Sequence, residues 1–149
     1  MGTGIEVIIA ALIATFIAQL LKFIFYYVKN KAINFRIFAS TGGMPSSHSA
    51  AVVSTMTSVG LIMGFESVEF AIALVFGLIV MYDAAGLRRS AGQMAAQLNM
   101  LVDSLYEQRP HNFRNKLIEL LGHTPLEVTM GALLGATISL AVHYKYLLG

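Results

Sequence analysis

Long apolar runs separated by short polar connections dominate the chain. The runs extend over about residues 5–28, 48–65, 68–87 and 125–144. Apolar runs of about 18 residues or more are long enough to cross the hydrocarbon core of a bilayer as helices. The pattern therefore predicts an all-α membrane protein with about four transmembrane helices.

The stretch from residue 90 to 108 has a different pattern. Its apolar positions follow helical spacing, and its polar positions lie elsewhere around the helix; the apolar set is Met94, Leu98, Leu101, Val102 and Leu105. This stretch is too polar to span a bilayer and is typical of an amphipathic helix lying on the membrane surface. Arg109-Pro110 ends it, and a second short amphipathic piece follows over 112–121.

Composition supports a single membrane domain over residues 1–149. Hydrophobic residues make up 56% of the 149 positions and charged residues only 12%, with a mean hydropathy of +0.70. The absence of cysteine excludes a disulfide framework and a thiolate metal site. A net charge of +2, without a basic and aromatic platform, argues against nucleic acid as a partner.

Basic residues are distributed unevenly among the connections. They gather after the first run and after the third, at Lys29, Lys31, Arg36, Arg88, Arg89, Arg109, Arg114 and Lys116. The connection between the second and third runs holds only Glu66 and Glu69. The positive-inside rule then places both basic connections in the cytoplasm and both termini outside the cell membrane. One cytoplasmic end would thus collect the polar stretches that flank all four runs.

The stretch Thr41–Ala50, TGGMPSSHSA, carries the most chemistry at that end. Its paired glycines permit unusual backbone angles. Pro45 predicts the first turn of a helix, which the serines cap, and His48 would lie in that turn. Backbone donors at a helix start favour an anion, which predicts a phosphate cradle with an imidazole inside it. The alternative is an ordinary capped helix start after a glycine loop.

A second polar motif precedes the last run. Thr124-Pro125-Leu126-Glu127 has the form of a capping box with proline at the first helical position. His123 lies four residues before Glu127, a spacing that brings the two side chains together. A carboxylate bonded to one imidazole nitrogen makes the other a better base or nucleophile. Glu127 could also serve as a cap alone.

Two charged residues fall inside the runs. Lys22 interrupts the first run, where it either extends to the interface or points inward at an anion. Asp83 lies near the end of the third run, and a carboxylate at that depth requires a partner. We expect it to form either a buried salt bridge with a neighbouring cation or part of a functional site.

These motifs resemble those of the type 2 phosphatidic acid phosphatase (PAP2) superfamily, and most closely its small divergent branch, related to acid phosphatases and vanadium haloperoxidases. The resemblance rests on PSSH at 45–48, on H-x3-E at His123 and Glu127, and on GHTPLEVTMGALLG. The family pattern is K-x6-RP, PSGH and SR-x5-H-x3-D. Here Ser47 replaces the glycine, Glu127 replaces the aspartate, and Leu117 stands where the arginine is expected.

The resemblance implies a role for each candidate residue. His123 would be the nucleophile that forms a phosphohistidine, with Glu127 orienting it, and His48 the general acid. The phosphate would be bound by Gly43, Ser46, Ser47, Lys22 and Arg88 or Arg89, with Asp83 positioning the cations. Lys22 is favoured as the first-motif cation over the alternative pair Lys29 and Arg36.

The resemblance also implies a metal-independent phosphatase without a cofactor. A site at the membrane boundary suits a lipid phosphomonoester, similar to phosphatidylglycerophosphate or phosphatidic acid, or a polyprenyl diphosphate. Three alternatives stay open: a non-catalytic phospholipid-binding or lipid-moving protein, a purely structural helical bundle, and a metal site built from His, Glu and Asp. A homodimer, in which a second copy covers polar flanks, is compatible with this picture.

Overall fold

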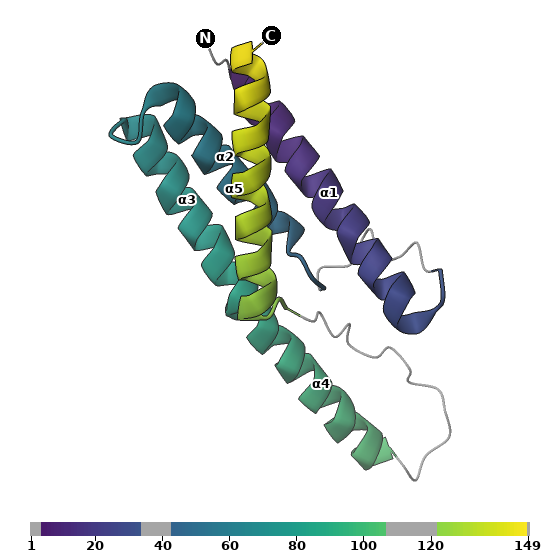
Figure 1. Ribbon diagram of the computed structural model, residues 1–149. Helices are drawn as coiled ribbons and strands as arrows, with labels where there is room; N and C mark the ends of the chain where they lie inside the picture. Colours follow the sequence, from purple (N-terminus) through teal and green to yellow (C-terminus); the bar gives the residue numbers. More distant parts are fainter. Residues whose placement is uncertain (1–3, 34–42, 107–121, 149) are drawn as a thin grey trace.

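The computed structural model describes residues 4–33, 43–106 and 122–148, all helices and connections (Figure 1). These described residues contain five helices: α1 (Gly4–Asn30), α2 (Ser47–Met63), α3 (Val68–Ala85), α4 (Leu87–Tyr106) and α5 (Pro125–Leu148). The predicted all-α fold is confirmed. The four apolar runs correspond to α1, α2, α3 and α5.

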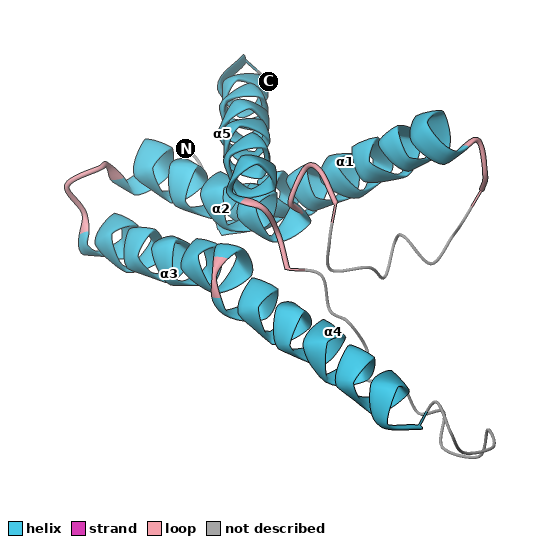
Figure 2. Ribbon diagram, turned by 90° about the horizontal axis from the view of Figure 1, so that it is seen from below, coloured by secondary structure: helices cyan, strands magenta, loops and turns pink. Residues whose placement is uncertain are grey.

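α2 lies at the centre of the bundle and packs against α1, α3 and α5 (Figures 1 and 2). Within the described residues, three helical segments are long and apolar enough to span a membrane: α1, α5 and the segment Val68–Val102, which begins with α3. α2 has 17 residues. At about 1.5 Å per residue it is somewhat shorter than the roughly 30 Å hydrocarbon core, and the other helices enclose it.

The interior is built from small residues. The core cluster contains Ala14, Ala18, Ala50 and Ile138. A Cβ added at Gly131 would clash with the Ser46 carbonyl oxygen, and one at Gly135 would clash with that of Ala50. The backbones of α5 and α2 are therefore nearly in contact, as small residues allow between helices in lipid.

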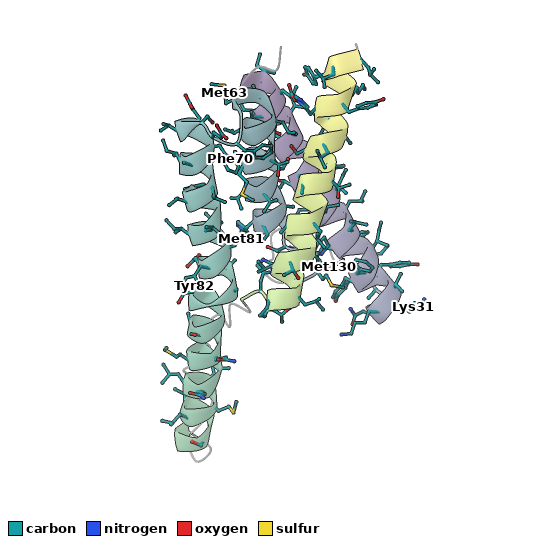
Figure 3. All side chains as sticks on the ribbon, turned by 60° about the vertical axis from the view of Figure 1, so that its left-hand side comes forward. Lys31, Met63, Phe70, Met81, Tyr82 and Met130 are labelled. Atoms are coloured by element: carbon teal, nitrogen blue, oxygen red, sulfur yellow. The ribbon has the colours of Figure 1, made fainter. Side chains whose placement is uncertain are left out.

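Large apolar side chains point outward instead. Leu12, Phe16 and Phe76 are all at least 60% exposed, and Tyr82 lies on the outer side of α3 in Figure 3. A water-soluble domain would bury such residues. A small-residue interior with an apolar outer surface is the arrangement that lipid requires, because lipid tails solvate apolar side chains.

Caps define the start of α2 and of α3. Ser46 is the N-cap of α2, and its Oγ accepts from the Ser49 N–H at 3.3 Å. Ser67 caps α3 in the same way, accepting from the Phe70 N–H at 3.1 Å. Capping by the serine motif is thus confirmed. The placement of Pro45 in the first turn was wrong: Pro45 precedes the N-cap, because Ser46 rather than an earlier residue supplies the capping oxygen.

A helix is present between the third and fourth runs as α4, and its placement on the membrane surface stays a prediction. It begins directly after Gly86 and continues nearly in line with α3, projecting beyond the bundle (Figures 1 and 2). Among the described helices it packs against α3 only. The second amphipathic piece expected at 112–121 lies outside the described residues.

The helix directions bring the ends of the chain together. α1 begins and α5 ends at one end of the bundle (Figure 1). In Figure 3, Lys31 and Met130 mark the other end, and Met63 marks the end near the termini. The C-terminal end of α1, the start of α2, the end of α3 and the start of α5 therefore share one end, as the order of the runs predicts.

Candidate active site

The polar stretches meet where α2 and α5 begin. The Ser46 N–H donates to the Glu127 carbonyl oxygen at 3.0 Å, joining the loop before α2 to the first turn of α5. The His123 N–H donates to the Ala84 carbonyl oxygen at 3.1 Å, joining the segment before α5 to the end of α3. Two backbone hydrogen bonds thus fix three chain segments that are far apart in sequence.

The start of α2 is a serine cluster with one exposed histidine. Ser46, Ser47 and Ser49 are buried, and the Ser49 hydroxyl donates to the Ser46 Oγ at 3.0 Å. His48 lies in the first turn, as predicted, and its side chain is exposed. The buried serines fix the backbone of the turn, while His48 stays accessible for proton exchange.

His123 and Glu127 form the expected pair. The His123 Nδ1 lies 3.2 Å from the Glu127 Oε2. The same oxygen accepts from the Thr124 N–H at 2.9 Å, and the Thr124 Oγ1 accepts from the Glu127 N–H at 3.3 Å. The capping box is confirmed, and one carboxylate oxygen both caps α5 and holds the imidazole.

This arrangement fixes the tautomer of His123. An ionised carboxylate is an acceptor, so Nδ1 must carry the hydrogen and Nε2 keeps its lone pair. The His123 side chain is 2% exposed, and Nε2 makes no hydrogen bond within the described part of the structure. A buried, oriented and unbonded imidazole nitrogen is available as a nucleophile or base.

Burial also sets the charge of His123. It lowers the pKa of His123 below the usual 6.5; the hydrogen bond to Glu127 opposes the shift, and nearby Lys22 and His48 add to it. The imidazole therefore stays neutral at neutral pH, which leaves Nε2 able to react. His48 lies beside it: the two ring centroids are 6.2 Å apart, with the planes inclined at 64°.

Lys22 reaches this site from α1. Its side chain is 4% exposed, and a Cβ added at Gly43 would lie 3.1 Å from the Lys22 Cγ. Gly43 has a φ of 101°, a conformation that glycine adopts readily. Gly43 thus adopts the turn conformation and also leaves room for the Lys22 side chain to pass close to the backbone. Lys29 is exposed on the last turn of α1, and Arg36 lies outside the described residues.

The sequence agrees with this geometry. The model of the divergent PAP2 family matches residues 4–138 of the chain. The chain belongs to the divergent PAP2 family. It is also similar to the uncharacterized membrane protein YuiD of Bacillus subtilis (strain 168), with 37% identity over 150 residues, covering 94% of this chain and 95% of YuiD. No solved structure matches the chain.

Other predicted residues of this PAP2-family protein are placed less completely. Asp83 is half-buried next to Ala84, whose carbonyl accepts from His123. Arg88 and Arg89 lie in the first turn of α4, directly after the end of α3. Their side chains lie outside the described part of the structure. The backbone thus brings this segment to the same end of the bundle as His123.

One residue of the site was missed by sequence reasoning. The Gln19 Nε2 donates to the Ser47 Oγ at 3.3 Å, linking α1 to the first residue of α2. The available signal was its position: Gln19 interrupts the apolar run three residues before Lys22, on the same side of the helix.

Among the described residues, no group of three or more His, Cys, Asp or Glu side chains is arranged to hold a metal ion.

Proposed function

We propose that this protein is a membrane-embedded phosphatase that hydrolyses a lipid phosphomonoester or a polyprenyl diphosphate. The observation that carries the proposal is the state of His123: buried, held at Nδ1 by Glu127, unbonded at Nε2 within the described residues, and adjacent to His48 and Lys22. Membership of the divergent PAP2 family supports phosphatase chemistry.

The reaction would proceed in two displacements. The His123 Nε2 attacks phosphorus and forms an N–P bond, while the bond from phosphorus to the leaving oxygen breaks and His48 donates a proton to that oxygen. Water then attacks the phosphohistidine, His48 takes the water proton, and the N–P bond breaks. The Glu127 carboxylate stabilises the positive charge that develops on the imidazole in the first step.

The phosphate oxygens would be held by the residues around the imidazoles. Lys22 supplies a buried positive charge, and backbone N–H groups at the start of α2 supply donors beside Ser46 and Ser47. Arg88 or Arg89 would complete the set from the start of α4. These interactions grow as charge develops on phosphorus, so they favour the transition state.

A lipid substrate follows from the site's location. The polar residues lie at one end of a bundle whose outer surface is apolar, so a headgroup phosphate could enter while its tails remain in lipid. We place this end at the cytoplasmic face of the cell membrane, because the basic connections flank it.

Phosphate release from detergent-solubilised protein tests the proposal. The substrates are phosphatidic acid, phosphatidylglycerophosphate and a polyprenyl diphosphate, with a soluble phosphomonoester for comparison. We expect release from at least one lipid, inhibition by orthovanadate and no loss with EDTA. Loss with EDTA, restored by a divalent ion, would favour metal-dependent chemistry. Release from none of the lipids would favour a binding or lipid-moving protein.

A further inference from the structure

The buried face of α1 has charge at both ends and methyl groups between. Its buried residues recur every fourth position: Glu6, Ala10, Ala14, Ala18 and Lys22. Spacing of four places them along one stripe of the helix. Glu6 and Lys22 are 16 residues apart, which corresponds to about 24 Å along the axis. One face of α1 thus reaches from the candidate active site to the opposite end of the bundle.

Glu6 is anchored at that opposite end. It is fully buried, and its Oε1 lies 2.6 Å from the Nδ1 of His143 on α5. The other carboxylate oxygen, Oε2, makes no hydrogen bond within the described residues. Removing His143 would leave a buried carboxylate with neither oxygen bonded to those residues, which is costly in a membrane. The contact therefore ties the start of α1 firmly to α5.

α5 has a similar row of residues, and much of this row packs closely against α2. Its members are again four apart: Glu127, Gly131, Gly135, Ser139 and His143. The two glycines lie against α2 carbonyl groups. Ser139 is hydrogen-bonded to Ser58 of α2 at 2.7 Å. Close backbone contact and this bond fix the depth of α5 relative to α2.

The contact of α1 with α2 and α5 resists axial sliding less than the contact between α2 and α5. Ala14 and Ala18 meet Ala50 and Ile138 in the core cluster, and alanine methyl groups interlock little with their neighbours. In lipid, a small axial shift exposes no apolar surface to water, so burial gives little resistance to sliding. Hydrogen bonds toward the two ends of α1 must therefore supply much of the resistance: Gln19 to Ser47 near the candidate active site, and Glu6 to His143 at the opposite end.

From this arrangement we infer that Glu6 and His143 are positioning residues that fix the depth of α1 and so hold Lys22 at the phosphate site. The inference rests on the proposed phosphate-binding role of Lys22. The apolar core cluster lies between the two ends, so the effect is transmitted by the rigid helix. A shift of one residue along α1 would move the Lys22 ammonium by about 1.5 Å, enough to lengthen a direct phosphate contact beyond hydrogen-bond distance.

Amine labelling tests the positioning without reference to activity. An amine-reactive reagent followed by mass spectrometry should modify exposed Lys29 and spare buried Lys22 in the wild type. We expect Glu6→Ala to raise Lys22 labelling about tenfold or more while Lys29 stays unchanged. Glu6→Gln should keep the wild-type protection, because its amide oxygen still accepts from Nδ1.

A matched control separates positioning from general loosening. Ser139→Ala removes the Ser58–Ser139 bond near the same end but leaves the Glu6–His143 contact in place. We expect Lys22 to remain protected in this variant. Equal labelling of Lys22 in Ser139→Ala and Glu6→Ala would overturn the inference, as would unchanged protection in Glu6→Ala.

Orthovanadate binding tests the consequence for the phosphate site. Glu6→Ala should weaken vanadate affinity about tenfold, as expected for a lost charge-assisted hydrogen bond, and Lys22→Met should weaken it at least as much. The double variant should match Lys22→Met alone, because Glu6 acts through Lys22. Losses that add in the double variant would overturn the inference.

The same measurements distinguish this inference from the proposed function. If the wild type binds vanadate but releases no phosphate from any lipid, the phosphatase proposal fails, while labelling and double-variant binding still decide the role of Glu6. If the wild type does not bind vanadate, Lys22 has no phosphate to hold, and the inference is overturned together with its premise.

Discussion

The two ends of the bundle each hold a histidine paired with a glutamate, but their burial is reversed. At the candidate active site the imidazole of His123 is 2% exposed and the carboxylate of Glu127 is 19% exposed. At the opposite end the carboxylate of Glu6 is 1% exposed and the imidazole of His143 is 17% exposed. The first pair joins residues four apart in sequence, and the second joins α1 to α5.

This reversal agrees with the two proposed roles, a nucleophile at His123 and helix positioning by Glu6 and His143. Burying an imidazole favours its neutral form and leaves a lone pair on Nε2. Burying a carboxyl group instead places acceptor oxygens in the interior, and these offer a phosphate no hydrogen-bond donor when ionised. Lys22 and His48 lie beside the first pair and add donors for an anion. The same two residue types thus suit nucleophilic chemistry at one end and helix attachment at the other.

Replacing the two histidines should separate the ends most clearly. We expect His123→Ala to lower kcat for lipid phosphate hydrolysis by about 10³-fold or more, because it removes the proposed nucleophile. His143→Ala should lower kcat/KM only about tenfold, because the nucleophile is intact and only Lys22 is displaced. Steady-state kinetics on both purified variants gives the comparison. Similar losses in both would contradict the assignment of chemistry to one end.

The second imidazole is a further difference between the ends. His48→Ala should lower the rate on a lipid phosphate by about 10²-fold, the usual range for loss of a general acid. The loss in kcat/KM, which reports the step that forms the phosphohistidine, should shrink for a p-nitrophenyl ester, whose leaving group needs no proton. The ratio of the two rates in wild type and variant is the measurement. A loss that is the same for both esters would exclude His48 as the proton donor.

Much of the bundle could be predicted from local sequence signals. The apolar runs set the helices, and the capping box at Thr124 and the serine cap at Ser46 set two helix starts. The convergence of the motifs followed from the order of the runs. Pro45 was misplaced because the helix begins two residues later: Ser46 is the N-cap, and its N–H is bonded to the Glu127 carbonyl across the bundle.

The long-range polar contacts could not be predicted in this way. His123 and Glu127 are four apart, so helix geometry alone pairs them. Glu6 and His143 are separated by most of the chain, and their pairing depends on how α1 packs on α5. Lys22 was favoured over Lys29 by its depth in the run, but its passage beneath Gly43 depends on the fold. Sequence periodicity predicts which face of a helix a residue lies on, but not which residue of another helix it contacts.

Replacing the glutamate of each pair by glutamine should have smaller effects, which should still differ between the two ends of the bundle. Glu127→Gln should retain the cap and the His123 tautomer, because its amide oxygen must accept from the Thr124 N–H and Nδ1 at the same position. We expect kcat to fall about tenfold through loss of the charge that stabilises the imidazolium. Glu6→Gln should leave kcat unchanged. Glu127→Ala would also lose the cap, at about 1 kcal/mol of stability, measurable by thermal unfolding in detergent.

The acid limb of the pH profile should give the smallest effect and still locate the proposed nucleophile. Because burial lowers the pKa of His123 below 6.5, the fall in kcat/KM that accompanies protonation of Nε2 should lie below that pH, while a separate fall at alkaline pH should follow the loss of the proton from the proposed general acid His48. Folding stability should also fall in acid. The unfolded state binds the His123 proton more readily than the folded state, so stability is lost as pH falls through 6.5.

Lys22→Met should move the acid limb of kcat/KM to higher pH, because it removes one charge that lowers the pKa of His123. An unmoved limb would contradict the placement of Lys22 beside His123. His143→Ala should move this acid limb less than Lys22→Met does. His143 lies at the far end of the bundle and can affect the pKa of His123 only by displacing Lys22.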